Sequence, residues 1–259
     1  MERPDYSILD RPEIIRFMFY PRPDHRPPPQ GASDIVFMSP DGTELCARFY
    51  ANDKDSPTIL FFHGNGEVTS DYDEIAHLYN KLGINLFVTD YRGYGKSKGT
   101  PTISNLVEDS HSALAALSSM LEKKGFSSSI YAMGRSLGAY CAIEIAAGAD
   151  DKTKGFIIES GSADVSAWLR ALLIHETPAI TNLVLNHWKR IQEIKLPLLT
   201  IHGEKDTLVP INRSRELFDA VASSEKQFII IEGAGHNDIM FTDTTKYLHA
   251  IRDFVLGKD

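Results

Sequence analysis

A serine between two glycines, in the stretch YAMGRSLGAY, is the residue whose setting most favours nucleophilic chemistry. Ser136 follows an apolar run and precedes an alanine-rich segment, with Gly134 and Gly138 on either side. A sharp strand-to-helix turn exposes a serine Oγ for attack, and glycines at these positions relieve the crowding inside such a turn. The helix N-terminus that follows would also stabilise a developing oxyanion. The same pattern fits a turn built from small residues, so the motif alone leaves both interpretations open.

A serine hydroxyl is a weak nucleophile and needs a general base. His236, in GAGHND, follows the last strong apolar run, and the glycines at 233 and 235 allow its loop to fold back over the sheet. His63 and His202 each directly precede a glycine after an apolar run, where we expect them to hydrogen-bond backbone and fix loops. The other histidines fall in predicted helices, in the N-terminal segment or in a long insertion: His25, His77, His111, His175, His187 and His249.

The base in turn needs a carboxylate to hold its tautomer and to stabilise the imidazolium. Asp206, in GEKDTLVP, follows another apolar run and is the preferred candidate. Glu159 is the second choice because it also ends a predicted strand. Glu204 is expected in a solvated loop. Asp238 could take the place of Asp206, but residues so near the histidine in the sequence rarely have the required geometry. The chain order serine, aspartate, histidine is the order typical of the nucleophile-elbow arrangement.

Short apolar runs that alternate with helical segments would bring these side chains together. A Pro-Asp-Gly turn within residues 34–51 predicts a β-hairpin, and a continuous apolar run such as 57–64 is expected of a strand buried on both faces. The alternation predicts an α/β fold, a mostly parallel sheet with helices on both faces. Ligands bind beyond the carboxyl ends of the strands in such sheets, where all the candidate residues fall. The other predicted strands are 84–93, 129–134, 155–160, 196–203 and 226–233, and the predicted helices are 71–82, 103–124, 137–147, 212–222 and 241–256.

Two segments depart from this alternation. Residues 1–33 are rich in proline, so we expect an extended N-terminal arm before the domain of residues 34–259, with the apolar cluster 14–20 able to pack against that domain. Residues 161–195 are too long for an ordinary crossover and predict a small cap of two amphipathic helices, which either seals the sheet or lines a pocket. The apolar residues at helical spacing are Val165, Trp168, Leu169, Leu172 and Leu173, then Ile180, Leu183, Val184, Trp188 and Ile191.

Composition excludes several classes of function. With 259 residues, 42% hydrophobic and 24% charged, the chain has the make-up of an ordinary soluble globular protein. A net charge of −8 gives no attraction to nucleic acid, and the lack of a long apolar run predicts no transmembrane segment. The two cysteines, Cys46 and Cys141, indicate neither a disulfide framework nor a metal site. We therefore expect a cytoplasmic enzyme that needs no metal or organic cofactor.

Five motifs carry a resemblance to a known family: FFHGNGE, DYRGYGKS, GRSLG, HGEKDTLVP and EGAGHNDI, in this order from residue 61 to residue 239. Together they resemble the α/β-hydrolase superfamily, and the chain is similar to its Bem46-like group, which includes the ABHD17-type protein depalmitoylases. The resemblance implies the α/β-hydrolase fold with an eight-stranded sheet. It also implies that Ser136 is the nucleophile, Asp206 the acid and His236 the base.

The same resemblance implies where an oxyanion hole lies. One N–H would come from Asn65 in the HGNG loop, where Gly64 and Gly66 allow the backbone to turn inward, and the other from Leu137. No catalytic group is implied in DYRGYGKS, where Arg92 is expected to be a structural hydrogen-bond donor. The depalmitoylases have a cysteine-rich N-terminus, whereas the first 45 residues here contain no cysteine, so protein depalmitoylation is not the expected activity.

These residues predict a serine hydrolase that cleaves small-molecule carboxylic esters or thioesters through an acyl-enzyme. A peptidase or amidase is the first alternative, because His236 can also protonate a leaving amine; Glu67 or Glu159 would then bind a free amino terminus. A non-catalytic binding module with the same fold is the second alternative, although such a module is expected to lose one of the three catalytic residues. A haloalkane dehalogenase is excluded, because its chemistry needs a carboxylate at the position of Ser136.

Overall fold

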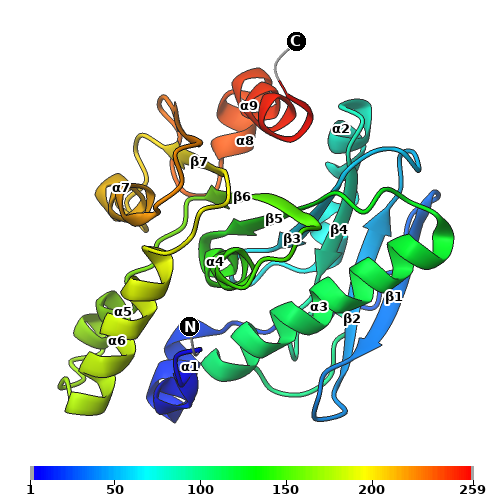
Figure 1. Ribbon diagram of the computed structural model, residues 1–259. Coiled ribbons are helices and arrows are strands. Elements are labelled where there is room, and N and C mark those ends of the chain that lie inside the picture. Colours follow the sequence, from blue (N-terminus) through cyan, green and yellow to red (C-terminus); the bar gives the residue numbers. More distant parts are fainter. Residues whose placement is uncertain (1–2, 258–259) are drawn as a thin grey trace.

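The computed structural model describes residues 3–257, except for the side chains of residues 167, 168 and 171. Its strands are β1 (Ala32–Met38), β2 (Glu44–Tyr50), β3 (Thr58–Phe62), β4 (Asn85–Thr89), β5 (Ile130–Arg135), β6 (Thr153–Glu159), β7 (Leu198–Gly203) and β8 (Lys226–Ile231). They form one eight-stranded sheet in the order β1-β2-β4-β3-β5-β6-β7-β8 (Figure 1). β2 pairs antiparallel with β1 and with β4, and the other pairs are parallel. The prediction of a mostly parallel sheet is confirmed.

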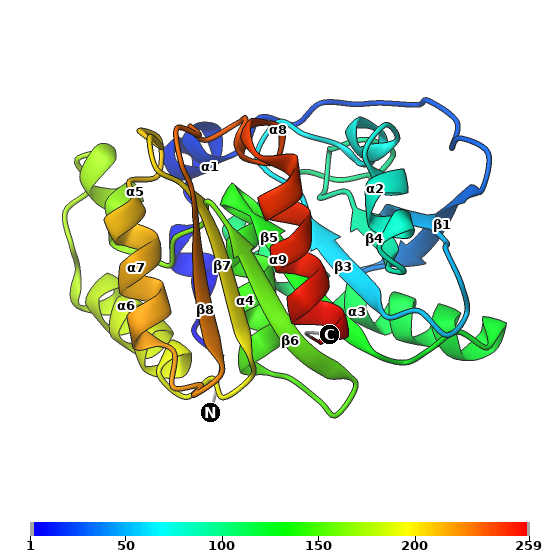
Figure 2. The ribbon, with the colours of Figure 1, turned by 90° about the horizontal axis from the view of Figure 1, so that it is seen from above.

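Helices cover both faces of this sheet, so the molecule has three layers. The helices of the domain are α2 (Ala76–Lys81), α3 (Ile103–Lys124), α4 (Ala139–Ala147), α7 (Ile211–Ala220), α8 (Ile239–Thr242) and α9 (Thr244–Leu256). One face carries α3, α4 and α7, and the other carries α2, α8 and α9 (Figures 1 and 2). The predicted helices are present, although the one expected over 71–82 is divided between the short 3-10 helix η2 (Thr69–Tyr72) and α2.

The central strand β3 shows how the apolar runs build both cores. All five of its residues are buried. Ile59 and Phe61 pack on the face of α2 and α9, while Leu60 and Phe62 pack on the face of α3 and α4. Burying each such side chain stabilises the fold by about 1.5–3 kcal/mol. Because Phe62 of β3 is paired with Gly134 of β5, the loops that follow these two strands begin side by side.

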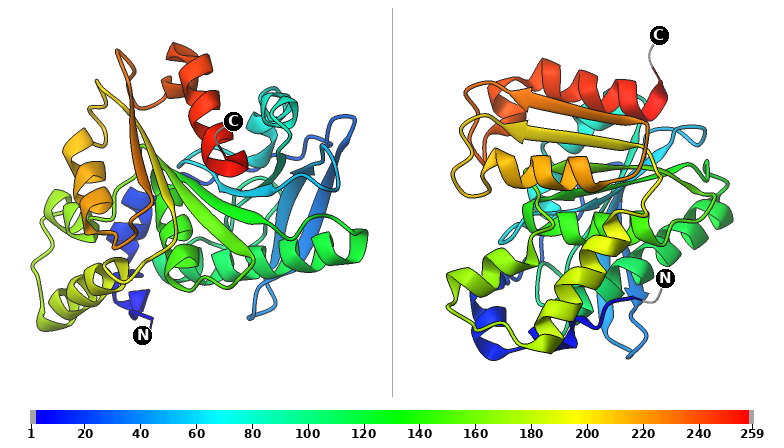
Figure 3. Two further views of the ribbon diagram at one scale, coloured as in Figure 1. Left: turned by 45° about the horizontal axis from the view of Figure 1, so that its top comes forward. Right: turned by 60° about the vertical axis from the view of Figure 1, so that its left-hand side comes forward.

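The N-terminal arm is not extended throughout, so this part of the prediction was wrong. Tyr6–Leu9 form the 3-10 helix η1 and Pro12–Met18 form α1, in which Pro12 lies in the first turn, where its missing N–H is not needed. Leu9 and Ile14 are fully buried in the core on the α3 side. The arm lies beside the insertion (Figure 3), and the Tyr6 hydroxyl is 2.7 Å from Nδ1 of a buried histidine there, His187. The arm is therefore part of the folded body.

The insertion forms the two predicted helices, α5 (Val165–Ala171) and α6 (Pro178–Ile191). α6 begins with a cap in which the Thr177 side chain accepts the Ile180 N–H. Ile180, Leu183 and Ile191 are buried in the core on the α4 side, where this helix packs against α4, α7 and η1. Trp168 was predicted on the apolar face of the first helix of the insertion, but its side chain is not among those described. Within residues 3–257, the structure has no helix with the length and apolarity that crossing a bilayer requires.

Candidate active site

The turn between β5 and α4 carries the candidate nucleophile. Ser136 has a φ of 51°, in the left-handed region that a non-glycine residue rarely adopts. A Cβ on Gly134 would overlap the carbonyl oxygen of Gly138, and a Cβ on Gly138 would overlap the carbonyl oxygen of Phe62. Both positions therefore require glycine, since the turn closes tightly on itself and on β3. This strained turn holds Ser136 at the carboxyl edge of the sheet.

Two side chains from later loops form a hydrogen-bonded chain with this serine. Nε2 of His236 lies 3.0 Å from Oγ of Ser136, and Nδ1 of His236 lies 2.8 Å from Oδ2 of Asp206. The three residues follow β5, β7 and β8, and parallel strands end at the same edge of a sheet. In this geometry the imidazole can take a proton from the serine while the carboxylate orients the ring. The structure thus brings together the three residues that the sequence selected.

Asp206 is held as an ionised acceptor. Its side chain is fully buried, and Oδ1 accepts the N–H groups of Leu208 at 2.9 Å and Val209 at 2.8 Å, which leaves Oδ2 for the histidine. Burial alone would raise the pKa of Asp206, but hydrogen bonds from His236 and from the Val209 N–H outweigh it and lower the pKa. The carboxylate is therefore charged at neutral pH and can stabilise an imidazolium.

Backbone contacts between the loops after β7 and β8 set the spacing of acid and base. The Lys205 N–H donates to the Ala234 carbonyl oxygen at 2.8 Å. Gly203, the last residue of β7, lies against the same loop, since a Cβ there would be 2.5 Å from the carbonyl oxygen of Gly235. A side chain at position 203 would separate the two loops and lengthen the contact between acid and base.

The other acids that the sequence offered are engaged elsewhere. Glu204 accepts the Gly233 N–H at 2.9 Å, and Asp238 accepts the Gly235 N–H at 2.7 Å, so both brace the histidine loop. Glu159 accepts a tyrosine hydroxyl from α9 at 2.7 Å. Each of these three acids therefore binds a group other than the His236 imidazole. The acid that contacts this imidazole is Asp206.

Two histidines at strand ends bind backbone, as predicted. Nδ1 of His63 lies 2.8 Å from the Gly64 carbonyl oxygen, and Nε2 of His202 lies 2.9 Å from the Val209 carbonyl oxygen. Burial is the main cause that lowers the pKa of His202, so its ring is neutral at pH 7. Both rings shape loops that carry candidate site residues. Arg92 is also structural, as expected, because its guanidinium binds Asp109.

The loop after β3 contains Asn65. Within residues 3–257 its backbone N–H has no protein acceptor, whereas the Gly64 N–H donates to Oε2 of Glu67 at 2.9 Å. The Asn65 side chain holds the loop: Nδ2 donates to the Met18 carbonyl oxygen at 2.9 Å, and Oδ1 accepts the Tyr94 hydroxyl at 2.7 Å. Because Met18 belongs to the N-terminal arm, the arm fixes the conformation of this loop. The sequence analysis missed that contact.

Leu137 lies where the second oxyanion donor was expected. It follows Ser136 in the short 3-10 helix η3 (Ser136–Gly138), which leads directly into α4. The first N–H groups of a helix have no acceptor within it and point out of its N-terminus. An anion that forms at the serine would therefore lie at the positive end of α4.

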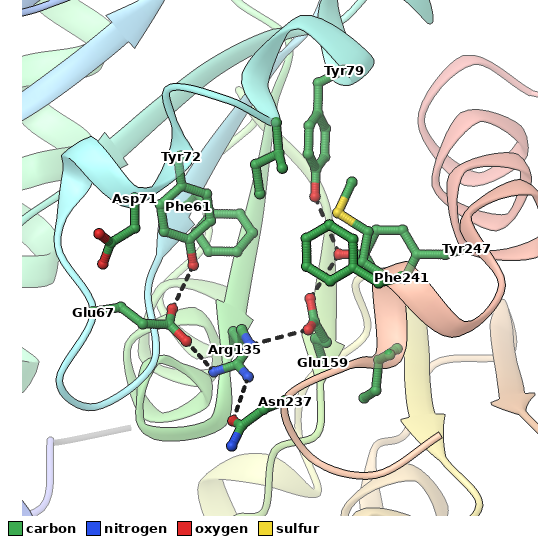
Figure 4. A pocket seen from close by; sticks show the side chains of 13 residues that line it. Phe61, Glu67, Asp71, Tyr72, Tyr79, Arg135, Glu159, Asn237, Phe241 and Tyr247 are labelled. Atoms are coloured by element: carbon green, nitrogen blue, oxygen red, sulfur yellow. Dashed lines mark hydrogen bonds and ion pairs between the residues drawn. The ribbon is translucent and has the colours of Figure 1, made fainter. Parts of the chain in front are cut away.

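A buried ion cluster beside the nucleophile was also missed. Arg135 lies 3.2 Å from Oε1 of Glu159 through Nε, pairs with Glu67 through Nη1, and donates to the His236 carbonyl oxygen at 3.0 Å through Nη2. These groups border a cavity of about 190 Å³ whose other walls are mainly aromatic and apolar side chains (Figure 4). The described lining of this cavity comes from outside residues 161–195. The sequence did contain a signal for this cluster, because a charged residue lies in each of two motifs: Glu67 in HGNGE and Arg135 in GRSLG.

Other chemistries find little support among the described residues. Cys46 and Cys141 are buried free thiols, and burial is the main cause that raises the pKa of Cys46 to about 12, so it is no thiolate nucleophile. Within the described part of the chain, no group of three or more histidine, cysteine, aspartate or glutamate residues is placed to hold a metal ion.

The chain is similar to known proteins. The profile of the family described as "Serine aminopeptidase, S33" matches residues 53–187 and 177–243, which include all three residues of the hydrogen-bonded chain. Protein bem46 of Schizosaccharomyces pombe is 32% identical over 208 residues, or 78% of this chain and 68% of that protein. Human alpha/beta hydrolase domain-containing protein 17B is 29% identical over 202 residues, or 76% of this chain and 66% of that protein.

A solved structure shares the fold. The esterase Pf2001 of Pyrococcus furiosus superposes with a TM-score of 0.72 at 17% identity, and the alignment covers 92% of this chain and 97% of that one. At this level of identity the likeness supports the arrangement of the strands and helices.

Proposed function

The chain belongs to the α/β-hydrolase family described as serine aminopeptidase S33, and we propose that it is a serine hydrolase acting on carboxylic esters or thioesters. The observation that carries this proposal is the hydrogen-bonded chain from Ser136 Oγ through His236 to Asp206, with distances of 3.0 and 2.8 Å. The left-handed φ of Ser136 supports it further, because such strain persists where a side chain must be presented for reaction.

Acylation begins when Ser136 Oγ attacks the carbonyl carbon of the substrate. His236 Nε2 takes the hydroxyl proton, and Asp206 holds the ring and stabilises the imidazolium that forms. Collapse of the tetrahedral intermediate breaks the bond to the leaving alcohol or thiol, which receives the same proton from Nε2. The products of this half-reaction are the acyl-enzyme and the free leaving group.

Deacylation repeats these steps with water. His236 removes a proton from a water molecule as its oxygen attacks the acyl carbon. The second intermediate collapses, the carboxylic acid leaves, and Ser136 Oγ recovers its proton from Nε2. No further reactant is required.

The backbone N–H groups of Asn65 and Leu137 would bind the oxyanion of both intermediates. The Asn65 N–H, which has no acceptor within residues 3–257, and the helix start at Leu137 support this assignment. Each donor of this kind contributes on the order of 100- to 1,000-fold to kcat.

Esters and thioesters fit the site better than peptides do. An aminopeptidase needs an acidic group to receive a free amino terminus, and Glu67 and Glu159 were the residues that offered one. Both are paired with Arg135, so a substrate amine would have to compete with its guanidinium for either carboxylate.

Labelling with a fluorophosphonate tests the nucleophile. The wild-type protein should react covalently, and Ser136→Ala should abolish the labelling. Ser160→Ala is a matched control, because Ser160 also follows a strand with a positive φ of 46° but is fully buried. Labelling that survives Ser136→Ala, or that is lost in both variants, contradicts the assignment.

A substrate panel tests the reaction class. Nitrophenyl esters of increasing acyl length should be hydrolysed beside a thioester and an aminoacyl amide. We expect kcat/KM for the ester or thioester to exceed that for the amide. A clear preference for the aminoacyl amide would assign the protein to the peptidases instead.

A further inference from the structure

Arg135 connects the loops of the candidate site and has no role in the proposed chemistry. It ends β5 directly before the serine of the elbow, and only 11% of its side chain is exposed. Its Nη2 donates to the carbonyl oxygen of His236 and to Oδ1 of Asn237, both at 3.0 Å. The guanidinium therefore holds the backbone of the residue whose ring must meet the serine.

Two glutamates hold this guanidinium in place. Glu159, at the end of β6, lies 3.2 Å from Nε of Arg135. Glu67 pairs with Nη1, and its Oε2 accepts the Gly64 N–H at 2.9 Å. Figure 4 shows Arg135 between the two glutamates, at the border of the cavity. One network thus joins the ends of β5 and β6 to the loops that follow β3 and β8.

We propose that Arg135 is a positioning residue for the reaction: it sets the place of His236 relative to Ser136 and, through Glu67, the place of the oxyanion loop. This inference rests on the proposed function, because it assigns a role within that reaction. Proton transfer requires the Nε2–Oγ contact, which is 3.0 Å here. A displacement of about 1 Å in such a group costs on the order of 100-fold in rate.

A guanidinium suits this position better than an ammonium group. Arg135 donates hydrogen bonds in several fixed directions at once, to Glu67, to a backbone carbonyl and to the Asn237 side chain, and its Nε lies 3.2 Å from Glu159. A lysine ammonium is a compact charge that cannot reach these acceptors in the same directions. Burial alone would lower the pKa of Arg135, but the charges of Glu67 and Glu159 outweigh it and raise the pKa. The side chain is therefore charged throughout the physiological range.

A second buried arginine offers a matched control. Arg48, in β2, lies 2.7 Å from Asp34 and 2.9 Å from Asp73, and it donates to the Arg26 carbonyl oxygen at 2.9 Å. Its partners are thus of the same kinds as those of Arg135, two carboxylates and one backbone carbonyl. These partners lie in the hairpin, in the arm and after η2, apart from the catalytic residues. Arg48→Lys therefore reports what the loss of a buried guanidinium does by itself.

The decisive experiment compares Arg135→Lys with Arg48→Lys in steady-state hydrolysis of the best nitrophenyl ester. Arg135→Lys should lower kcat on the order of 10- to 100-fold, with KM changed by less than about twofold, because the reacting groups are displaced while substrate binding is kept. Arg48→Lys should lower the midpoint of thermal unfolding and leave kcat near the wild-type value. An equal kcat in both variants, or a loss in Arg135→Lys confined to KM, overturns the proposal.

Chemical rescue provides a second readout that a purely structural role would not produce. Arg135→Ala leaves a space that opens to the cavity of about 190 Å³, because Arg135 lines it. Millimolar guanidinium should restore part of kcat in Arg135→Ala and have no such effect on Arg48→Ala. The absence of rescue in a folded Arg135→Ala protein contradicts the proposal. If that variant fails to fold, the comparison of the two lysine variants decides.

Failure of this inference is distinguishable from failure of the proposed function. Full hydrolytic activity in Ser136→Ala rejects the proposed function and this inference with it. Loss of activity in Ser136→Ala together with a wild-type kcat in Arg135→Lys rejects this inference alone.

Discussion

Two buried ion clusters of similar chemistry serve different parts of the molecule. In each, one arginine binds two carboxylates and one backbone carbonyl. The Arg48 cluster consists of Arg48, Asp34 and Asp73, and the Arg135 cluster consists of Arg135, Glu67 and Glu159. The first holds the carbonyl of Arg26 and so ties the arm to the hairpin, whereas the second holds the carbonyl of the candidate base. The role of such a cluster therefore depends on which backbone carbonyl its arginine binds, because the charged groups of the two clusters are of the same kinds.

The charge balance of the two clusters differs. Lys96 also binds Asp34, at 2.5 Å, so two cations face the two carboxylates of the Arg48 cluster. Burial alone would raise the pKa of Asp34, but hydrogen bonds from Arg48 and Lys96 outweigh it and lower the pKa. In the Arg135 cluster one cation serves both carboxylates, and burial raises the pKa of Glu159 in spite of that cation. Groups that are costly to ionise gather at functional sites.

The largest predicted difference between the two regions concerns catalysis. Asp206→Asn should lower kcat about 10,000-fold, because an amide favours the wrong tautomer of His236 and cannot stabilise its charged form. Asp73→Asn, in the Arg48 cluster, should leave kcat nearly unchanged and lower the free energy of unfolding by about 2 kcal/mol. Ester hydrolysis and urea unfolding of both variants measure this. A smaller loss of kcat in Asp206→Asn than in Glu159→Gln would assign the role of acid to Glu159.

An intermediate effect is expected where the arm meets the site. Asn65→Ala keeps the backbone N–H but removes the side chain that the Met18 carbonyl and the Tyr94 hydroxyl hold. A looser loop should lower kcat about 10-fold, less than the loss expected for deleting an oxyanion donor outright. The rate of the acylation burst measures this effect. Asn52→Ala, whose side chain binds Ser56 before β3, is the control, and equal burst rates in both variants would refute this role of the arm.

The smallest predicted difference is in the pH dependence of stability. The lowered pKa of Asp34 means that this carboxylate adds stability above its ordinary pKa of 3.8, and the gain is lost as pH falls through the folded value. The raised pKa of Glu159 has the opposite consequence: stability declines as pH rises from the ordinary value of 4.5 through the raised one. As pH rises, the free energy of unfolding of Asp34→Asn should therefore fall relative to wild type, whereas that of Glu159→Gln should rise relative to wild type.

Urea unfolding at several pH values between about 3 and 8 measures both trends, across the ordinary carboxyl pKa values. If the difference in unfolding free energy from wild type changes with pH in the same direction for both variants, the two clusters do not differ in charge balance.

The strands could be predicted because their burial leaves a mark on the sequence. The run PTILFFHG predicted a strand over 57–64, and β3 occupies Thr58–Phe62 within it. A strand covered on both faces needs apolar residues at successive positions, so no partner strand has to be known. The glycines at 134 and 138 were predictable for a similar reason, since the crowding that excludes a Cβ arises within one turn and the strand beside it.

The arm was predicted wrongly because proline has two structural meanings. A proline in the middle of a helix breaks it, but in the first turn its missing N–H is not used. The second helix of the insertion was predicted from its apolar spacing and begins at Pro178, while Pro12, at the corresponding position of α1, was read as part of an extended segment. What favours the helix at Pro12 is the burial of Ile14 and Met18 against the body. The apolar cluster 14–20 indicated that packing, but its composition did not indicate that the segment is helical.

The sequence was sufficient to propose Ser136, Asp206 and His236 as neighbours in one candidate site, because each follows an apolar strand and parallel strands must end at one edge of their sheet. It was not sufficient to find what holds these residues in place. The Asn65 side chain binds the arm 47 positions away, and Arg135 binds the histidine loop 101 positions away. Such contacts depend on how the loops pack in three dimensions, since a charged or amide side chain in a loop has many possible partners and only the folded chain selects among them.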